Sequence, residues 1–436
     1  MKRKAARALI APIEIAGFYT NLARELRGLG IYVDLAFYYE NTFDYREKGD
    51  SFALVRIIRK LKKKSSESNL TITKLAYAGL AEIFSLVFTL LSLRRYDNYI
   101  FGFGASLLTV THLDLIILKL FRKKVISVVA HGSECRPPFM NGRFSNQKPE
   151  ILAREAFRLI WNLRWMENFA SEIIGSPYST SIYANRPFLN FFDFGLPSPS
   201  VETGVRVQAE CGKAGLKVLH APSSRATKGT SDIIKIVDRV RNEGHPINLT
   251  ILEGYSNAAL LERIPQFDLV IDQLYCDTPM PGLALECVHL GVPVLVAGYQ
   301  LRELESFMPN KRLPPTIICH PDELKNQLIR LTKSQSQLVT YKEESSRYVL
   351  NLDNRPSVGK AFLEVMEGNH QLSKINPREI RYFEGIGQPQ ITTARQILSV
   401  YDYGGVRAMG LKAKPELANE ILDWARKVFE DAEATS

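Results

Sequence analysis

Cysteine is scarce in this sequence, and no motif makes use of it. The chain of 436 residues has five cysteines, an odd number, with no CxxC pair and no cysteine and histidine spacing suited to zinc. They lie far apart in the chain, at Cys135, Cys211, Cys276, Cys287 and Cys319. We therefore expect a reduced, cytoplasmic protein that holds no structural metal.

Several familiar motifs are missing as well. Neither GxxxxGK[ST] nor GxGxxG occurs, which excludes a P-loop and a dinucleotide-binding fingerprint. No helix-turn-helix, zinc-finger or RNP-like pattern accompanies the basic residues, so nucleic acid is not an expected partner. A cleaved signal peptide is not expected either, because the apolar run after the basic start is short and contains Glu14. That run suits a first buried strand instead.

The overall composition is that of a globular protein. Hydrophobic residues make up 45% of the chain and charged residues 23%, which excludes a disordered or fibrous protein. The length exceeds what one hydrophobic core usually serves, so we expect two domains. The net charge of +10 arises in the front part, because residues 1–130 contain 21 Lys and Arg against 11 Asp and Glu, while the other 306 residues contain 35 of each.

Part of this positive charge is concentrated in "RIIRKLKKK", residues 56–64. An apolar stretch follows at 75–93, with Glu82 as its only charge. The stretch is long enough to span a membrane, but a carboxylate in its middle favours a core or interface helix. A basic cluster beside an apolar helix is also typical of contact with an anionic membrane surface, here through residues 56–95. A solvated basic face explains the same pattern, and both interpretations stay open.

Short apolar runs alternate with helix-like segments along the chain. This rhythm predicts an α/β protein with two Rossmann-like, doubly wound parallel sheets. The expected strands are 7–13, 31–39, 96–103 and 124–131 in the first half, and 216–223, 247–254, 267–275, 292–298 and 316–320 in the second.

Three regions follow from this pattern. We expect a first domain at 1–200 and a second at 201–370, joined by a segment at 196–215 that is rich in Pro, Ser and Gly. The remaining residues, 371–436, contain the amphipathic "KPELANEILDWARKVFED". Its apolar face is expected to dock on the first domain or on a partner.

The loop "HAPSSRATKGTSD", residues 220–232, lies between an expected strand and an expected helix. We expect Thr230 or Ser231 to cap that helix. Its amino-terminal N–H groups and dipole favour an anion, and the charges of Arg225 and Lys228 add to this preference. Gly229 allows close approach of the backbone. The loop therefore predicts a phosphate or pyrophosphate site, although a basic solvent loop would have the same composition.

A second polar loop follows the strand at 267–275. It leads into a helix that is expected to open at Pro281 and Gly282, with Glu286 in its first turn. A carboxylate there can accept hydrogen bonds from a vicinal diol such as ribose, while the N–H groups of Gly282 and Leu283 face the same space. Together, the basic loop and this acidic helix predict a site for a nucleotide diphosphate.

With "HAPSSRATKGT", "IDQLY…PGLALECVHLGVPVLV", "IAGFYTNLARELRGLGI" and "VVAHGSECRPPF", the chain resembles GT-B glycosyltransferases of the group 1, or family 4, kind. The likeness covers roughly residues 8–365 in motif order. It implies two Rossmann-like domains facing across a cleft. It also implies transfer of a sugar from a nucleotide diphosphate on the second domain to an acceptor on the first, usually with retention and without a metal or other cofactor.

The resemblance also implies residue roles. Arg225 and Lys228 match the basic pair at the donor pyrophosphate, and Glu286 matches the second glutamate of the E-x7-E motif, at the ribose. His131 resembles the histidine near the transferred sugar, where we expect it to position the sugar first and act as acid or base second. Further candidate donor-binding residues are Gly17, Ser223, Ser224, Gly229, Glu253, Gly254, Gly282 and Leu283.

One position departs from the family. Thr278 stands where the first glutamate of the motif would be, and we consider three substitutes near the donor sugar: Asp272, Gln273 and Asp277. The departure supports an alternative, an inactive nucleotide-sugar-binding scaffold, and a nucleotide-sugar epimerase is a second alternative. The acceptor is expected to be a saccharide or a glycolipid, of the kind used in polysaccharide assembly. The protein would then be cytoplasmic or peripheral at the inner face of a membrane.

Overall fold

The computed structural model describes residues 6–40, 52–199, 215–352 and 357–434, which fall into two compact units. Both units are discontinuous in the chain. The first comprises Met1–Cys135, Arg158–Ser198 and Pro356–Ile380, and the second comprises Arg136–Phe157, Pro199–Arg355 and Arg381–Ser436. Most of the expected linker at 196–215, and with it the boundary at 200 and Cys211, lies outside the described residues.

The first unit is built on a seven-stranded sheet with the order β12-β6-β5-β4-β3-β1-β2. Every pairing is parallel except that of the short last strand, β12, with β6. The strands are β1 (Arg7–Ala11), β2 (Tyr32–Leu35), β3 (Asn98–Gly102), β4 (Lys124–Val129), β5 (Glu172–Gly175), β6 (Phe188–Asn190) and β12 (Lys374–Ile375).

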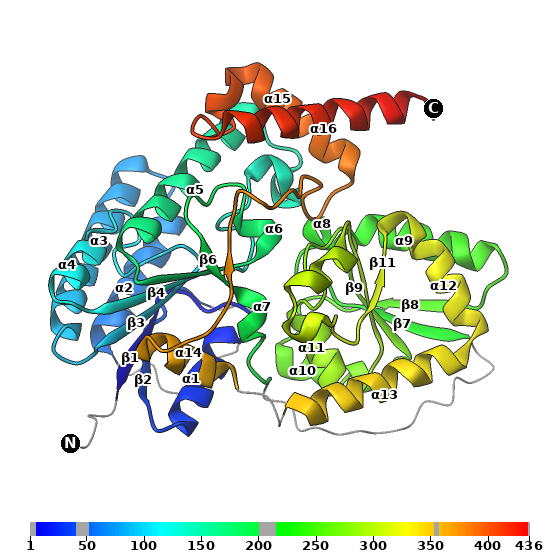
Figure 1. Cartoon of the computed structure of the whole chain (residues 1–436), viewed down its shortest axis with the longest axis horizontal. Coiled ribbons are helices and arrows are strands. Elements are labelled where there is room, and N and C mark those ends of the chain that lie inside the picture. Colours follow the sequence, from blue (N-terminus) through cyan, green and yellow to red (C-terminus); the bar gives the residue numbers. More distant parts are fainter. Residues whose placement is uncertain (1–5, 41–51, 200–214, 353–356, 435–436) are drawn as a thin grey trace. The chain divides into compact units, whose positions relative to one another are not determined.

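Helices cover both faces of this sheet (Figure 1). One apolar cluster packs α1 and α14 against the strands, and a second packs α2, α3 and α4 against them. The helices are α1 (Phe18–Gly28), α2 (Ala53–Glu67), α3 (Thr71–Ser92), α4 (Leu113–Leu120), α6 (Pro177–Thr180), α7 (Phe191–Phe194) and α14 (Val358–Glu367), and α5 (Pro149–Phe169) crosses the boundary between the units.

The second unit has a five-stranded parallel sheet with the order β11-β10-β9-β7-β8. Its strands are β7 (Leu216–His220), β8 (Ile247–Ile251), β9 (Leu269–Gln273), β10 (Val294–Ala297) and β11 (Ile317–Cys319). Its helices are α8 (Arg225–Lys228), α9 (Thr230–Asn242), α10 (Asn257–Leu261), α11 (Gly282–His289), α12 (Leu324–Lys333), α13 (Gln335–Leu352), α15 (Gln390–Ala408) and α16 (Pro415–Ala434).

These two sheets confirm the predicted fold class, two doubly wound α/β units. All nine expected strands form, and β5, β6 and β12 are additional. The strand order reverses once in each sheet. The chain moves outward from β1 to β2 and then resumes on the other side of β1 with β3, and β7, β8 and β9 repeat the arrangement. Loops that leave two adjacent strands in opposite directions open a crevice at the carboxyl ends, where such sheets bind ligands.

The end of the chain is divided differently from the expected region at 371–436. The chain is already back in the first unit at α14, where Gly359 N–H donates to Glu25 of α1 over 2.7 Å, and β12 then joins the sheet. From Arg381 onward the chain belongs to the second unit. There the amphipathic α16 packs its buried face against α15, within the same unit.

Candidate functional site

In the second unit the crevice lies at the carboxyl ends of β7 and β9. The loop after β7 is the basic "HAPSSRATKGTSD", and the loop after β9 leads to α11. The loop after β8 lies on the other side of β7 in the same sheet. Three loops that were predicted from separate parts of the sequence therefore meet at one edge of the sheet.

The basic loop forms a short helix before the expected one. Ser224 caps this helix, α8, by accepting a hydrogen bond from the N–H of Thr227. Gly229 then adopts a left-handed conformation, with φ of 68°, and α9 begins at Thr230 without a side-chain cap. The expected capping role of Thr230 or Ser231 is therefore wrong. The Thr230 hydroxyl is buried and instead contacts His220 Nε2 at 2.8 Å.

A backbone hydrogen bond and a contact of the His220 imidazole hold the loop after β7 against the end of β9. The N–H of Leu274 donates to the carbonyl oxygen of Lys228 over 3.1 Å, and His220 Nδ1 lies 2.8 Å from the carbonyl oxygen of Ile271. A Cβ atom at Gly229 would stand 2.8 Å from the Cβ of Leu274. The approach is thus so close that the loop needs glycine for space as well as for its backbone angles.

Each cation of the basic loop has a carboxylate partner, but the two pairs differ in exposure. Arg225 binds Glu253, after β8, in a bidentate pair with both side chains largely in solvent. Lys228 Nζ lies 2.6 Å from Asp272 Oδ1 at the end of β9, where the lysine side chain is 16% exposed and the aspartate fully buried. Arg225 also holds the pKa of Glu253 below its ordinary value. The exposed pair is easily exchanged, whereas the buried pair is a fixed part of the fold.

Glu286 lies in the second turn of α11, one turn later than expected, and is only 7% exposed. Its carboxylate accepts a hydrogen bond of 2.7 Å from the amide of Asn257, the first residue of α10. The loop after β8 therefore contacts both neighbours, Arg225 through Glu253 and Glu286 through Asn257. These two contacts tie the basic loop and the acidic helix together.

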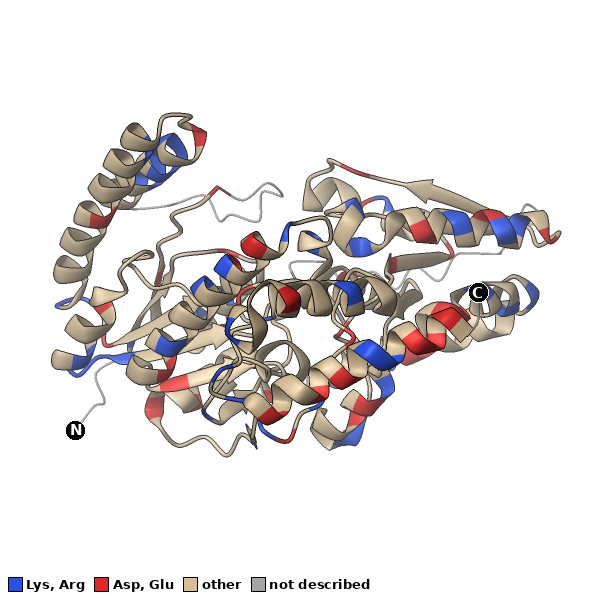
Figure 2. Ribbon diagram, turned by 90° about the horizontal axis from the view of Figure 1, so that it is seen from above, with Lys and Arg blue, Asp and Glu red and all other residues tan. Residues whose placement is uncertain are grey.

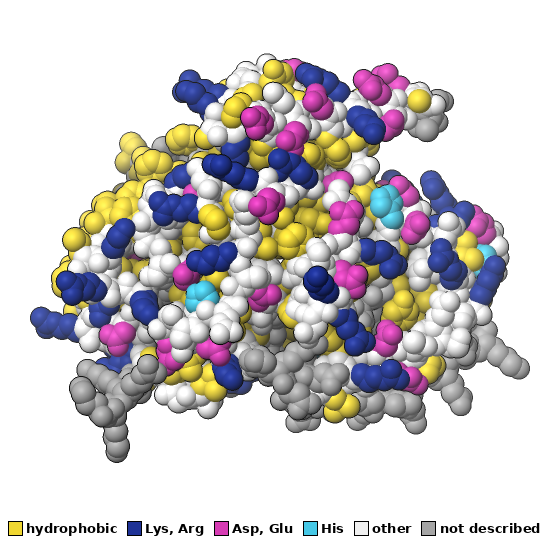
Figure 3. Space-filling model, viewed as in Figure 1, with side chains coloured by type: hydrophobic (Ala, Val, Ile, Leu, Met, Phe, Trp, Pro, Cys, Tyr) yellow, Lys and Arg dark blue, Asp and Glu magenta, His cyan; other side chains and the backbone are white. Residues whose placement is uncertain are grey.

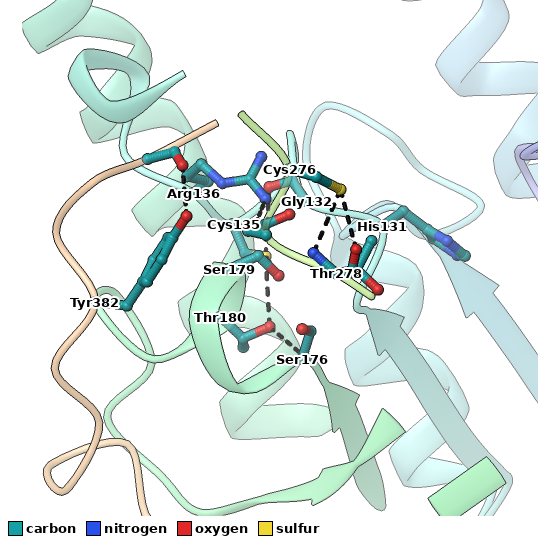
Figure 4. A network of polar contacts seen from close by, with 12 residues as sticks. His131, Gly132, Cys135, Arg136, Ser176, Ser179, Thr180, Cys276, Thr278 and Tyr382 are labelled. Carbon is teal, nitrogen blue, oxygen red and sulfur yellow. Dashed lines mark hydrogen bonds and ion pairs between the residues drawn. The ribbon is translucent and has the colours of Figure 1, made fainter. Parts of the chain in front are cut away.

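The three residues considered as substitutes for the missing glutamate all have partners inside the protein. Asp272 binds Lys228, and the amide of Gln273 contacts the Cys276 sulfur, which also lies 3.1 Å from the carbonyl oxygen of Thr278 (Figure 4). Asp277 forms a buried ion pair with Arg136, which stands next to Cys135 in the chain but belongs to the second unit. The contacts of these side chains hold the loop after β9 in its conformation.

The remaining predicted residues of the second unit lie on the same loops. Ser223 is exposed before α8, and Gly254, with φ of 75°, is exposed after β8. Gly282 and Leu283 are the first two residues of α11, whose amino-terminal end follows Pro281. Within the described ranges no group of three or more His, Cys, Asp or Glu side chains is arranged to hold a metal ion.

In the first unit the crevice lies at the carboxyl ends of β1 and β3. Gly17, with φ of 77°, starts α1 there, and the carboxylate of Glu14 accepts hydrogen bonds from the N–H groups of Tyr19 and Thr20. The Tyr19 ring passes so close to Gly102, at the end of β3, that a Cβ atom at that glycine would overlap it. Its hydroxyl lies 2.9 Å from His131 Nε2, after β4.

The His131 imidazole stands among aromatic rings. Its ring centre is 5.3 Å from that of Phe18, 5.5 Å from that of Tyr19 and 6.1 Å from that of Phe191. Burial in this environment lowers the pKa of His131 to about 4. The imidazole is therefore neutral at pH 7, which suits a hydrogen-bonding role better than that of a proton donor.

Three residues that contact the predicted site residues were not identified from the sequence. Tyr19 fixes His131, Asn257 binds Glu286, and Arg136 binds Asp277. Arg136 and Tyr19 lie within motifs that had already been singled out, "VVAHGSECRPPF" and "IAGFYTNLARELRGLGI", but nothing in their spacing indicates a partner more than one hundred residues away. No pattern in the sequence indicated that Asn257 would bind Glu286. The serine before Asn257 caps α10.

Sequence comparison finds no matching protein family and no matching characterised protein. Among solved structures, the chain is similar to HepE of Anabaena in complex with UDP-glucose, with 12% identity, a TM-score of 0.46 and coverage of 84% of this chain and 100% of HepE. It is also similar to a glycosyltransferase from Rickettsia africae ESF-5, with 12% identity, a TM-score of 0.44 and coverage of 85% and 100%. A UDP-N-acetylglucosamine 2-epimerase matches with 11% identity, a TM-score of 0.41 and coverage of 84% and 98%. These low values carry no argument about activity.

Proposed function

We propose that the protein is a glycosyltransferase of the GT-B kind, which moves a sugar from a nucleotide diphosphate bound by the second unit to an acceptor bound by the first. One observation carries this proposal. The crevice of the second sheet, where doubly wound sheets bind ligands, is bordered by the loop that carries both cations and by the loop that leads to the helix of Glu286. A diphosphate needs the cations, and a ribose diol suits a carboxylate.

The two cations, Arg225 and Lys228, have different roles in binding the diphosphate. Arg225 is exposed and exchangeable, so a diphosphate can take the place of Glu253 and be bound by the guanidinium in two hydrogen bonds. Lys228 gives one N–H to Asp272 and keeps two for the ligand, in a fixed position. Such preorganised positive charge stabilises a leaving phosphate without reorganisation during the reaction, and it would serve in place of a metal ion.

The transfer itself breaks the bond between the anomeric carbon and the phosphate oxygen, and the electron pair leaves with the diphosphate. The acceptor hydroxyl oxygen forms the new bond to that carbon, and its proton passes to the departing phosphate oxygen, which makes retention the expected outcome. His131, neutral and held by Tyr19, positions the sugar. Asp272 and Asp277 act as positioning residues through Lys228 and Arg136.

The surface of α2 and α3 supports a membrane-bound acceptor. Exposed apolar side chains recur along one face of α3 at helical spacing and continue beyond it in the first unit (Figure 3). On α3 they are Ile72, Leu75, Leu80, Ile83, Val87, Leu90 and Leu91, and beyond it Val110, Leu113, Leu120, Phe121 and Trp161. A patch of this extent is unusual on a free soluble surface and is typical of a binding face.

The charges beside this face are arranged to leave it apolar. Glu82 turns away from it, toward Lys62 and the hydroxyls of Thr109 and Thr111. Lys62 is largely buried with it, at 10% exposed, and Arg59 donates to the Phe37 carbonyl oxygen. The other four basic side chains of the cluster, Arg56, Lys60, Lys63 and Lys64, are exposed. Figure 2 marks the positions of Lys and Arg along the ribbon in blue.

Within the described residues α3 alone has the length and composition of a membrane span, with a mean hydropathy of 1.7 and 28% of that window buried. Ala81, Ser85 and Phe88 are buried, so one face of α3 packs against the first unit while the rest of the helix stays exposed. We infer that α3 lies in the surface of an anionic membrane, with the exposed basic side chains of α2 beside the head groups. The acceptor is then a glycolipid, used at the cytoplasmic face.

A nucleotide panel tests the donor site. Thermal unfolding is followed with UDP, GDP, ADP and their sugars, because a ligand that binds the folded state raises its stability by RT ln(1 + [L]/Kd). We expect one base to stabilise the protein, with the shift abolished by Arg225→Ala and by Glu286→Ala. Arg239→Ala, an exposed cation in the last turn of α9, is the matched control and keeps the shift.

Product analysis then separates the activities. A glycoside formed from the stabilising nucleotide sugar and a lipid extract supports transfer. Release of an epimeric nucleotide sugar would assign an epimerase, and binding without any product would assign a scaffold. If no nucleotide stabilises the protein, the donor site is refuted.

A further inference from the structure

A cavity of ≈ 320 Å³ opens at the base of the α2 and α3 hairpin, on the first unit. One side is formed by the start of α2 and the other by the end of α3 and the residues after it. Its lining residues are Phe52, Ala53, Leu54, Phe88, Leu91, Ser92, Arg95 and Tyr96. A buried apolar cavity of about 150 Å³ already admits a benzene ring, so this space holds several methylene groups.

The cavity is continuous with the exposed apolar face of α3. Leu91, the last residue of that face, is 63% exposed and stands at the rim. The inner wall contains Phe88, which is 4% exposed and whose ring lies 5.4 Å from that of Phe52. A hydrocarbon chain lying along α3 therefore reaches the cavity without crossing a polar surface.

One cation lines the cavity, and two more stand close to its lining residues in the chain. Arg95 lines the cavity with its guanidinium 5.1 Å from the ring centre of Phe52, and it is tethered to Asp34 over 3.0 Å. Arg94, the preceding residue, and Arg56, one turn into α2, are both exposed. An apolar interior lined by one arginine, with exposed basic residues close by in the chain, matches an anionic head group that carries a long chain.

We propose that this cavity binds an acyl chain of an anionic phospholipid, so that one membrane lipid is held by the α2 and α3 hairpin. The inference rests on the membrane contact proposed above but not on the transferase activity. Each methylene group that enters the cavity stabilises the bound state by about 0.8 kcal/mol. Exclusion of two of them weakens binding about tenfold.

The test uses photoreactive phosphatidylglycerol with a diazirine near the end of one acyl chain. The full chain is irradiated with vesicles that contain this lipid, and separately with monomers of the matching lysophosphatidylglycerol, and the labelled peptides are located by mass spectrometry. We expect labels at 52–54 and 91–96. Leu91→Trp at the rim and Ala53→Trp within the wall lower this labelling about tenfold. Leu90→Trp, on the same exposed face but outside the lining, is the matched control and keeps it.

The two probes separate the possible failures. Labelling by the monomer without sedimentation on anionic vesicles would retain the cavity site and refute the membrane contact. Sedimentation with labels confined to 72–87 would refute the cavity site and retain the membrane contact. Equal loss in Leu90→Trp and Leu91→Trp would also overturn the proposal, since it would show that the cavity is not specific. Folding of each variant is checked by its thermal unfolding midpoint.

Discussion

The two sheets share a strand order but present different chemistry where the order reverses. In the second unit the crevice carries cations with carboxylate partners, Arg225 with Glu253 and Lys228 with Asp272. In the first unit the corresponding place carries glycine, aromatic rings and a neutral imidazole, together with the carboxylates of Glu14 and Glu134, which accept hydrogen bonds from backbone N–H groups. One crevice thus suits a charged diphosphate, and the other suits an uncharged sugar or hydroxyl.

The comparison shows that the strand order determines where a ligand can bind, and that the side chains of the loops determine which ligand binds there. In both units a glycine with positive φ allows the loop after the first strand to turn, Gly17 in one and Gly229 in the other. The two loops differ in the side chains that they present to the crevice. Four substitutions test the contrast, in order of expected effect.

Lys228→Ala tests whether the second crevice depends on a buried ion pair. The change leaves the fully buried Asp272 carboxylate without its cation, which should lower the free energy of unfolding by about 3–5 kcal/mol. Urea unfolding measures this loss. The double variant Lys228→Met with Asp272→Asn removes both charges and should recover most of the stability. If Lys228→Ala alone is as stable as wild type, the pair is not part of the fold.

Gly229→Ala tests the close contact between the loops of the second crevice. A Cβ atom there meets that of Leu274 at 2.8 Å and also strains a backbone with φ of 68°, so we expect a loss of about 2–3 kcal/mol. Gly244→Ala is the control, because its φ is +84° but its Cβ atom meets nothing within 4 Å. It should cost only about 1 kcal/mol. Equal losses would show that space is not the constraint.

His131→Phe tests whether the imidazole in the first crevice is neutral. The imidazole of wild type binds a proton near pH 6.5 when unfolded but only near pH 4 when folded, so its contribution to stability falls as the pH drops through this window. His131 contributes at most about 1.4 kcal/mol per pH unit to this slope, and the variant should lose that contribution, while the other buried histidines, His112, His220 and His289, keep theirs. Tyr19→Phe should keep the slope, because burial and not the hydrogen bond lowers the pKa. Stability at pH 7 and pH 5 decides the question.

Glu253→Gln tests whether Arg225 is exchangeable. Removing the carboxylate frees the guanidinium, so binding of the stabilising nucleotide should tighten about threefold, as expected for an exposed pair. Calorimetric titration measures the change, and Glu262→Gln, an exposed carboxylate at the end of α10, should leave binding unaltered. Weaker binding in Glu253→Gln would instead assign its carboxylate to direct contact with the nucleotide.

The sequence by itself determined the two parallel sheets and the loops that stand at their crevices. Apolar runs bounded by glycine and polar residues identified nine strands correctly, since local periodicity carries that information. It also located the basic loop and the helix that carries Glu286. The helix begins at Gly282 as expected, but Glu286 was placed one turn too early, because it is the fifth residue of α11 and a turn holds only 3.6 residues.

Only the tertiary structure decided which charges pair and which side chains remain exposed. Arg136 meets Asp277 across 141 residues of chain, and Gly359 meets Glu25 across 334, so no local pattern contains either contact. The same holds for "RIIRKLKKK", where packing turned Arg59 and Lys62 inward and left the other cations outside. Periodicity is a property of neighbours along the chain, whereas ion pairing and burial depend on which distant segments fold against them.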